Sequence, residues 1–172
     1  AASDVYKRQL VSLAKFWQDV SNQETERFSD KVLKRLFVLS YAPNGMWTYI
    51  TSVYFMYHRN ENDEIEENAF CRFLDCITAF IWAYAITNPG VNSLRTPVYA
   101  EMVKIIRGED VTFSDFKFSE DEKRQMLLQY QAKENHYITD YALDFEGIGQ
   151  VGTFDTRYVT NTSNQLCAMV TT

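Results

Sequence analysis

Five basic side chains fall at helical spacings, and lysine and arginine are the residues that neutralise phosphates. Lys31, Lys34 and Arg35 share one face of a predicted helix, and Lys104 and Arg107 share a face of another. Charges placed in this way most commonly solvate the outer side of an amphipathic helix. Contact with DNA phosphates is the functional alternative, and all five side chains are candidates for it.

A sixth cation, Arg95, lies in the stretch "AITNPGVNSLRTPVYAEM", residues 85–102. The stretch is predicted to end one helix and begin the next, which places Arg95 beside a helix N-terminus. A cation there is repelled by the helix dipole unless a carboxylate or a phosphate lies between them. Glu101, one turn into the helix, is the expected partner within the chain, and a DNA phosphate is the alternative.

The stretch "GIGQVG", residues 147–152, matches the glycine spacing of the dinucleotide-binding fingerprint. That chemistry needs a helix after the glycines, so that the helix N-terminus meets the pyrophosphate. The residues that follow, "TFDTRYVTNTS", make a poor helix. Nucleotide binding at these glycines is therefore expected only if residues 153–160 prove helical.

Two further groups of side chains have the types that bind metals. Asp110, Asp115 and Lys117 resemble the carboxylates and lysine of metal-dependent nucleases, but such a site needs two or three carboxylates that converge on Mg²⁺. Cys71 and Cys76 lie within an apolar helical pattern and lack a second ligand pair for zinc. We predict buried thiols and no metal site.

The two histidines, His58 and His136, have no neighbouring serine or cysteine in a nucleophile–base pattern. His58 ends a predicted helix, where the dipole favours a partly positive imidazole. A structural role is therefore expected for His58, and no catalytic residue is predicted in the chain.

The composition is that of a globular helical domain. The chain has 172 residues, 46% of them hydrophobic, with a net charge of −6 and only 6 Gly and 3 Pro. The negative charge argues against a surface that tracks nucleic acid everywhere, but allows a local basic face. Three cysteines suit a reducing compartment. The longest apolar run, residues 77–86, is about half of what a bilayer needs, so we expect a cytoplasmic protein without a membrane span.

Apolar residues recur at three- and four-residue steps over most of the chain, the period of amphipathic helices. The strongest stripe is Phe70, Phe73, Leu74, Ile77, Phe80, Ile81 and Tyr84. Weaker stripes are Leu10, Leu13, Ala14, Trp17 and Val20, then Val32, Leu33, Leu36, Phe37 and Leu39, and lastly Val98, Met102, Ile105 and Ile106. The predicted helices cover 10–20, 30–42, 46–59, 68–87, 97–107 and 120–131, the fifth capped by Thr96 and the sixth by a Ser119–Glu122 capping box.

The two ends of the chain differ from this helical part. The segment "AASDVYKRQ", residues 1–9, resembles an in-frame translation of a sequencing-library adapter, as in a metagenomic fragment, with a native polar N-terminus as the alternative. Beyond residue 135 the helical period is lost. We therefore predict a helical domain over 10–131 and an irregular or strand-like tail over 132–172, which a truncation or frame shift would explain.

The strings "YAPNGMWTYITSVYFMYHR" and "RFLDCITAFIWAYAITNPGVNSLRTPVYAEMVKII" resemble the helical central region of GmrSD-type modification-dependent restriction endonucleases. The resemblance covers about residues 10–131 and rests mainly on "NPGVNSLRTPVYAEM". In that family a ParB-like N-terminal domain couples nucleotide hydrolysis to cleavage by an HNH-type C-terminal domain. The resemblance implies a nucleoside triphosphate and a divalent metal for the parent protein, but neither domain's motif occurs in this chain.

We therefore expect a mainly α fold, an antiparallel multi-helix bundle with an irregular or strand-like C-terminal tail. The expected function is that of a non-catalytic piece of a phage-defence nuclease, which positions the flanking ParB-like and HNH-type domains and touches DNA. An autonomous helical protein–protein docking module is the alternative.

Overall fold

The structure is a computed structural model that describes residues 2–42, 45–87, 92–117, 119–122, 157–158 and 169–170. Helices account for most of these residues, which confirms the predicted mainly α fold class. The helices are α1 (Ala2–Ser21), α2 (Asp30–Ser40), α3 (Met46–His58), α4 (Glu67–Thr87) and α5 (Arg95–Ile106).

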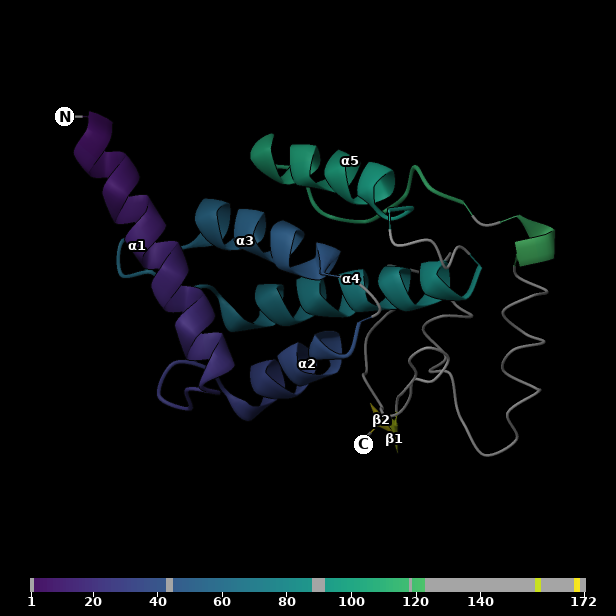
Figure 1. The fold of residues 1–172 in the computed structure, drawn as a ribbon, viewed down its shortest axis with the longest axis horizontal. Coiled ribbons are helices and arrows are strands. Elements are labelled where there is room, and N and C mark those ends of the chain that lie inside the picture. Colours follow the sequence, from purple (N-terminus) through teal and green to yellow (C-terminus); the bar gives the residue numbers. More distant parts are fainter. Residues whose placement is uncertain are drawn as a thin grey trace.

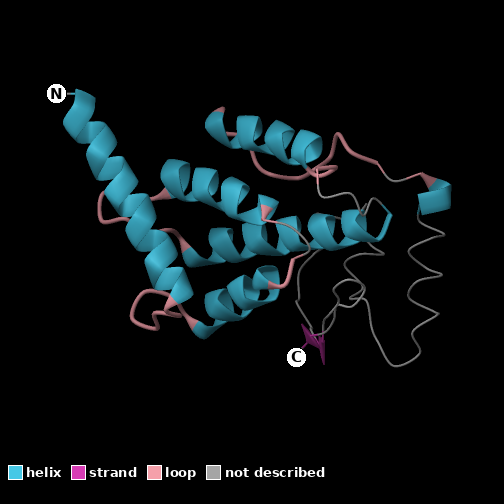
Figure 2. Ribbon diagram, viewed as in Figure 1, coloured by secondary structure: helices cyan, strands magenta, loops and turns pink. Residues whose placement is uncertain are grey.

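Four helices lie side by side in the order α5, α3, α4 and α2, and α1 crosses one end of this row (Figure 1). α2 packs on α4 and α3 packs on α5, so the main contacts join helices that are separated by one element in the sequence. Figure 2 shows the described loops gathered mostly at the ends of the helices. α2 and α5 therefore form the two edges of the row.

The apolar stripe predicted on α4 is buried, as expected from its period. Its seven members are at most 8% exposed: Phe70, Phe73, Leu74, Ile77, Phe80, Ile81 and Tyr84. The ring of Tyr54 in α3 stacks on Phe73 with a centroid distance of 4.0 Å. Burial of each large apolar side chain contributes about 1.5–3 kcal/mol, so the seven residues of this stripe stabilise the fold substantially.

α1 differs from its prediction in extent and in its buried face. The helix begins at Ala2, eight residues before the predicted start at Leu10. Phe16, which the predicted stripe omitted, is fully buried and stacks on Phe55 at 4.4 Å, whereas Leu10 is 50% exposed. The reason is that α1 meets the row of helices with its second half, so that its first half has no described helix to pack against (Figure 1).

Two apolar residues predicted on buried faces are half exposed. Phe37 in α2 is 49% exposed and Ile106 in α5 is 51% exposed, while the unpredicted Val38 is buried. Both helices lie at an edge of the row and contact other helices on one side only (Figure 1). An edge helix buries a narrower stripe than a central one, which the sequence period alone does not show.

The start of α5 also corrects the prediction. The helix begins at Arg95 with Leu94 as N-cap, and not with Thr96 as the cap. Pro97 is therefore the third helical residue, which is tolerated because the first N–H groups of a helix have no intrahelical acceptor. Gly108, at φ +78°, follows the C-terminus of α5 as predicted.

The other boundaries agree with the predictions to within two residues. Ser29 is the N-cap of α2, α3 ends at His58, and α4 ends at Thr87. The turn predicted over residues 88–90 lies outside the described residues.

The aromatic segment after α5 returns to pack on α4. Phe113 is fully buried and stacks on Phe80 with centroids 3.9 Å apart, and Phe116 meets the same ring edge-on at 5.2 Å. The thiol of Cys76 donates to the carbonyl oxygen of Val111 at 3.4 Å. These contacts fix the segment after α5 against the centre of the fold.

The predicted capping box is present. The backbone N–H of Ser119 donates to Glu122 Oε2 at 2.7 Å, and that of Glu122 donates to Ser119 Oγ at 3.2 Å. Residues 120–122 are helical, and the rest of the predicted sixth helix lies outside the described residues.

Two short strands belong to the predicted tail. β1 (Arg157–Tyr158) pairs antiparallel with β2 (Met169–Val170), with Arg157 opposite Val170. The remainder of residues 132–172 lies outside the described residues.

Candidate functional site

Three of the six predicted DNA-contact residues lie on α2, and the structure separates them into two kinds. Lys31 and Lys34 are exposed, and their ammonium groups make no ion pair within the part of the chain that the structure describes. Arg35 instead reaches α4, where its Nε donates to Asp75 Oδ1 at 2.8 Å and its Nη2 donates to Asp75 Oδ2 at 3.1 Å. The two lysines are accessible to a phosphate, whereas Arg35 ties α2 to α4.

The carboxylate that holds Arg35 is almost fully buried. The side chain of Asp75 is 3% exposed, and its removal from water raises its pKa from 3.8 to about 6, against the opposing effect of Arg35. A buried charge is tolerated only with a close partner, and the loss of that partner is strongly destabilising. Arg35 is therefore needed by the fold.

The three candidates on α5 divide in the same way. Arg95 and Arg107 are exposed, at opposite ends of the helix. Lys104 donates to Glu101 Oε1 at 2.9 Å and lies 2.9 Å from Asp115 Oδ2. The ammonium group of Lys104 is thus already held by two carboxylates.

The expected pairing of Arg95 with Glu101 is wrong. Glu101 is 2% exposed, pairs with Lys104, and also accepts a hydrogen bond from the backbone N–H of Thr112 at 3.1 Å. Six residues along a helix correspond to about 240° of rotation, so Arg95 and Glu101 point to different sides of α5. The residue three positions on, Lys104, shares the face of Glu101.

A hollow of about 520 Å³ lies between α1, the loop before α2 and the loop before α4. Its apolar lining residues include Phe16, Phe28 and Phe70. Its lining also includes two cations, Lys15 and Arg27, and six carboxylates, those of Asp19, Glu24, Glu26, Asp63, Glu64 and Glu67.

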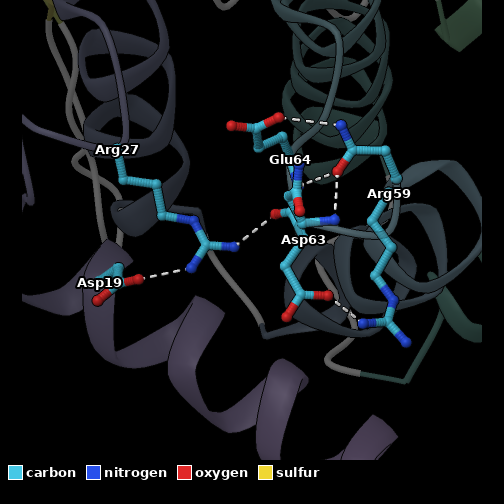
Figure 3. Close-up of polar contacts among 7 residues, drawn as sticks. Asp19, Arg27, Arg59, Asp63 and Glu64 are labelled. Carbon is cyan, nitrogen blue, oxygen red and sulfur yellow. Dashed lines mark hydrogen bonds and ion pairs between the residues drawn. The ribbon is translucent and has the colours of Figure 1, made fainter.

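Arg27 joins the elements around this hollow (Figure 3). Its Nη1 donates to Asp19 Oδ2 at 2.6 Å and its Nη2 donates to the carbonyl oxygen of Asp63 at 2.9 Å. The guanidinium carbon lies 5.6 Å from the ring centroids of both Phe16 and Phe28, within the range of a cation–π contact. Arg27 therefore holds the end of α1 to the loop before α4.

The loop before α4 has its own polar contacts. Arg59 pairs with Asp63, and Asn60 Nδ2 donates to Glu64 Oε2 at 2.9 Å (Figure 3). Burial of Asp63 favours a higher pKa, but hydrogen bonds from Ser12 and Arg59 outweigh it and hold the pKa below its usual range. Sequence spacing did not single out Arg27 or Asp63, because Arg27 bonds to residues 8 and 36 positions away.

The side chains that resemble a nuclease metal site do not converge. Asp115 is paired with Lys104, while Asp110 and Lys117 are exposed. Within the described ranges, no group of three or more His, Cys, Asp or Glu side chains is placed to hold a metal ion.

The burial predicted for Cys71 and Cys76 and the position predicted for His58 at the end of a helix are confirmed. Cys71 and Cys76 are buried free thiols, and burial raises the pKa of Cys76 to about 12. His58 is the last residue of α3, where its Nδ1 lies 3.1 Å from the carbonyl oxygen of Tyr54 and its ring stacks on that residue at 4.0 Å. His136 lies outside the described residues.

The glycines of residues 147–152 also lie outside the described residues. Arg157 and Tyr158, which follow them, form the strand β1 and not a helix. The condition set for nucleotide binding, a helix over residues 153–160, is therefore not met at these two residues.

Searches of protein-family models, of curated proteins and of solved structures found no match to this chain. Over the residues that the structure describes, none of the helices combines the length and the apolar character that crossing a membrane requires.

Proposed function

We propose that this chain is a non-catalytic helical module of a GmrSD-like, modification-dependent restriction endonuclease. In this proposal residues 10–131 form an antiparallel multi-helix bundle in a cytoplasmic phage-defence protein that cleaves modified DNA. The bundle positions a ParB-like domain, which hydrolyses a nucleoside triphosphate, and an HNH-type domain, which cuts DNA with a divalent metal ion. The proposal is supported by the sequence resemblance, by two buried carboxylates that join elements of the fold, and by exposed cations that are accessible to DNA.

The observation that carries the proposal is the role of the two buried carboxylates. Asp75 holds Arg35 and so joins α4 to α2, and Glu101 holds Lys104 and the backbone of Thr112 and so joins α5 to the segment after it. Each carboxylate therefore fixes one element of the fold against another. A module that positions other domains needs such rigidity.

The accessible cations support a contact with DNA. Lys31 and Lys34 on α2, Arg95 at the start of α5 and Arg107 at its C-cap are exposed. Since Arg35 and Lys104 are held by carboxylates, the proposed DNA contacts narrow from six residues to these four.

Long-read sequencing of the source locus tests the assignment. The proposal requires coding regions for a ParB-like and an HNH-type domain on either side of this sequence, in one reading frame. A complete reading frame without either region would overturn it.

A binding measurement tests the DNA contact separately. Duplex DNA is expected to bind at low salt, and the double variant Lys31→Gln with Lys34→Gln is expected to reduce the slope of log affinity against log salt by about 1.8. Arg35 is left unchanged in this variant, because its loss would disturb the fold. An unchanged slope would remove α2 from the DNA contact.

One observation favours the alternative of a protein-docking module. Tyr99, Val103 and Ile106 are 50%, 43% and 51% exposed and, at spacings of four and three residues, share one face of α5. Exposed apolar faces of this kind mark protein contacts. A docking module predicts no affinity for DNA at low salt and no flanking nuclease regions.

A further inference from the structure

The outer face of α2 combines two lysines with two exposed aromatic rings. Lys31, Lys34 and Phe37 follow one another at spacings of three residues, which places them along one side of the helix. Tyr41 is the C-cap residue of α2, and its ring contacts that of Phe37. The rings of Phe37 and Tyr41 are 49% and 52% exposed.

The core does not need these rings. α2 packs into the fold mainly through the side that carries Val32, Leu36 and Leu39, which are at most 4% exposed. Val38, 5% exposed, is also buried, and its helical position lies between those of Lys31 and Lys34. Phe37 and Tyr41 contact each other edge to face, with centroids 5.1 Å apart and planes at 71°. Because one ring presents only its edge in such a pair, ring faces remain open to a flat partner.

The accessible charged groups on this face are Lys31 and Lys34 and, one turn before Lys34, the exposed carboxylate of Asp30, which together sum to +1. The ammonium groups of Lys31 and Lys34 have no ion-pair partner within the described part of the chain. The charge of Arg35 is offset by Asp75, and Asp30, in the first turn, is the acidic residue of this helix. The helix rises about 1.5 Å per residue, so the lysines lie toward its N-terminal end and the rings toward its C-terminal end.

We propose that the outer face of α2 binds an unpaired stretch of nucleic acid, with its phosphates at Lys31 and Lys34 and its bases stacked on Phe37 and Tyr41. Cations that follow the backbone beside aromatic rings that stack bases are the combination by which proteins hold single strands. A duplex hides the faces of its bases and can offer this surface only its phosphates. This inference rests on the proposed function and extends it, because it specifies that α2 binds single-stranded and not duplex nucleic acid.

Fluorescence anisotropy of the full chain with labelled oligothymidylate, oligouridylate and a duplex tests the proposal. The double variant Phe37→Leu with Tyr41→Leu is expected to weaken single-strand binding at least tenfold, because stacking of each base on an aromatic ring is worth about that much. Its affinity for the duplex is expected to stay unchanged. The variant Lys31→Gln with Lys34→Gln is expected to reduce the salt slope for single strands by about 1.4.

The matched controls are Tyr49→Leu, which removes an equally exposed ring from α3, and Lys15→Gln, which removes an exposed lysine from α1. Both are expected to bind single strands as the wild type does. Wild-type affinity in the Phe37 and Tyr41 double variant would overturn the proposal, and so would the absence of single-strand binding by the wild type. The latter result would leave this face to a protein partner.

Photocrosslinking gives a second readout that does not depend on the folding of any variant. An oligonucleotide with 5-iodouracil is expected to crosslink to Phe37 or Tyr41 in the wild-type chain, as located by mass spectrometry. Crosslinks confined to other helices would contradict the proposal. Since the locus sequence is read independently, failure of this inference is distinguishable from failure of the proposed function.

Discussion

The buried ion pair between Arg35 and Asp75 predicts an unusual dependence of stability on pH. Burial raises the pKa of Asp75 from 3.8 to about 6 in the folded protein, so the folded state binds this proton more tightly than the unfolded state does. Stability from this group is therefore complete below about pH 4 and is lost as the pH rises through about 6. The folded chain is expected to gain stability from Asp75 on mild acidification.

The size of the effect follows from the two pKa values. A difference of about two in pKa corresponds to about 3 kcal/mol between the acidic and the neutral limits. Between pH 7.5 and pH 5, linkage gives a gain of about 1 kcal/mol in the free energy of unfolding from Asp75 alone. Other carboxylates contribute their own dependence, so the effect is measured as a difference between two proteins.

The assay is urea denaturation of the wild type and of Asp75→Asn at both pH values. Asparagine keeps the shape of the side chain but does not titrate, so the variant is expected to lack the gain of about 1 kcal/mol between pH 7.5 and pH 5 that Asp75 supplies. The comparison cancels the titration of groups that both proteins share. Equal changes in the free energy of unfolding with pH in the two proteins would refute the reasoning. They would show that folding does not raise the pKa of Asp75.

Three further predictions concern the core, a turn and the cysteines. Phe16→Ala, which removes a fully buried ring, is expected to lower the free energy of unfolding by about 3–5 kcal/mol in urea titrations, and a loss below 1 kcal/mol would mean that α1 is not packed as described. Gly108→Ala is expected to cost about 1–2 kcal/mol in the same assay, because the φ of +78° strains an L-residue although nothing lies within 4 Å of the added Cβ. In a Cys167→Ser variant, Cys71 and Cys76 are expected to react with a thiol reagent only after unfolding, since both are buried with raised pKa values. Fast reaction of either in the native protein would show that α4 opens readily.

The sequence predicted the helices well where one physical effect dominates. The stripe of α4 runs from Phe70 to Tyr84 in a helix of 21 residues and faces packed helices, so period and burial agree. The Ser119–Glu122 capping box is equally local, since both of its hydrogen bonds span three residues. In patterns of this kind, the residues that interact lie within a few positions of each other in the sequence.

The sequence failed where the partner lies far along the chain. Arg35 is 40 residues from Asp75, and no spacing rule links them. Leu10 and Phe16 both fit an apolar stripe, but only the crossing point of α1 decides which is buried. The five cations at helical spacings looked equivalent in the sequence, and only the structure shows that Asp75 holds Arg35 while Glu101 and Asp115 hold Lys104.

The proposed role requires that α1–α5 behave as one rigid body built on a shared aromatic core. Trp17 and Trp47 report on this directly, because their rings meet at 5.5 Å where α1 packs on α3. In a Trp82→Phe variant, urea unfolding is followed by tryptophan fluorescence and by far-ultraviolet circular dichroism. One shared midpoint is the expected result; a fluorescence change completed well before the helices melt would show that α1 detaches on its own and would contradict the single core.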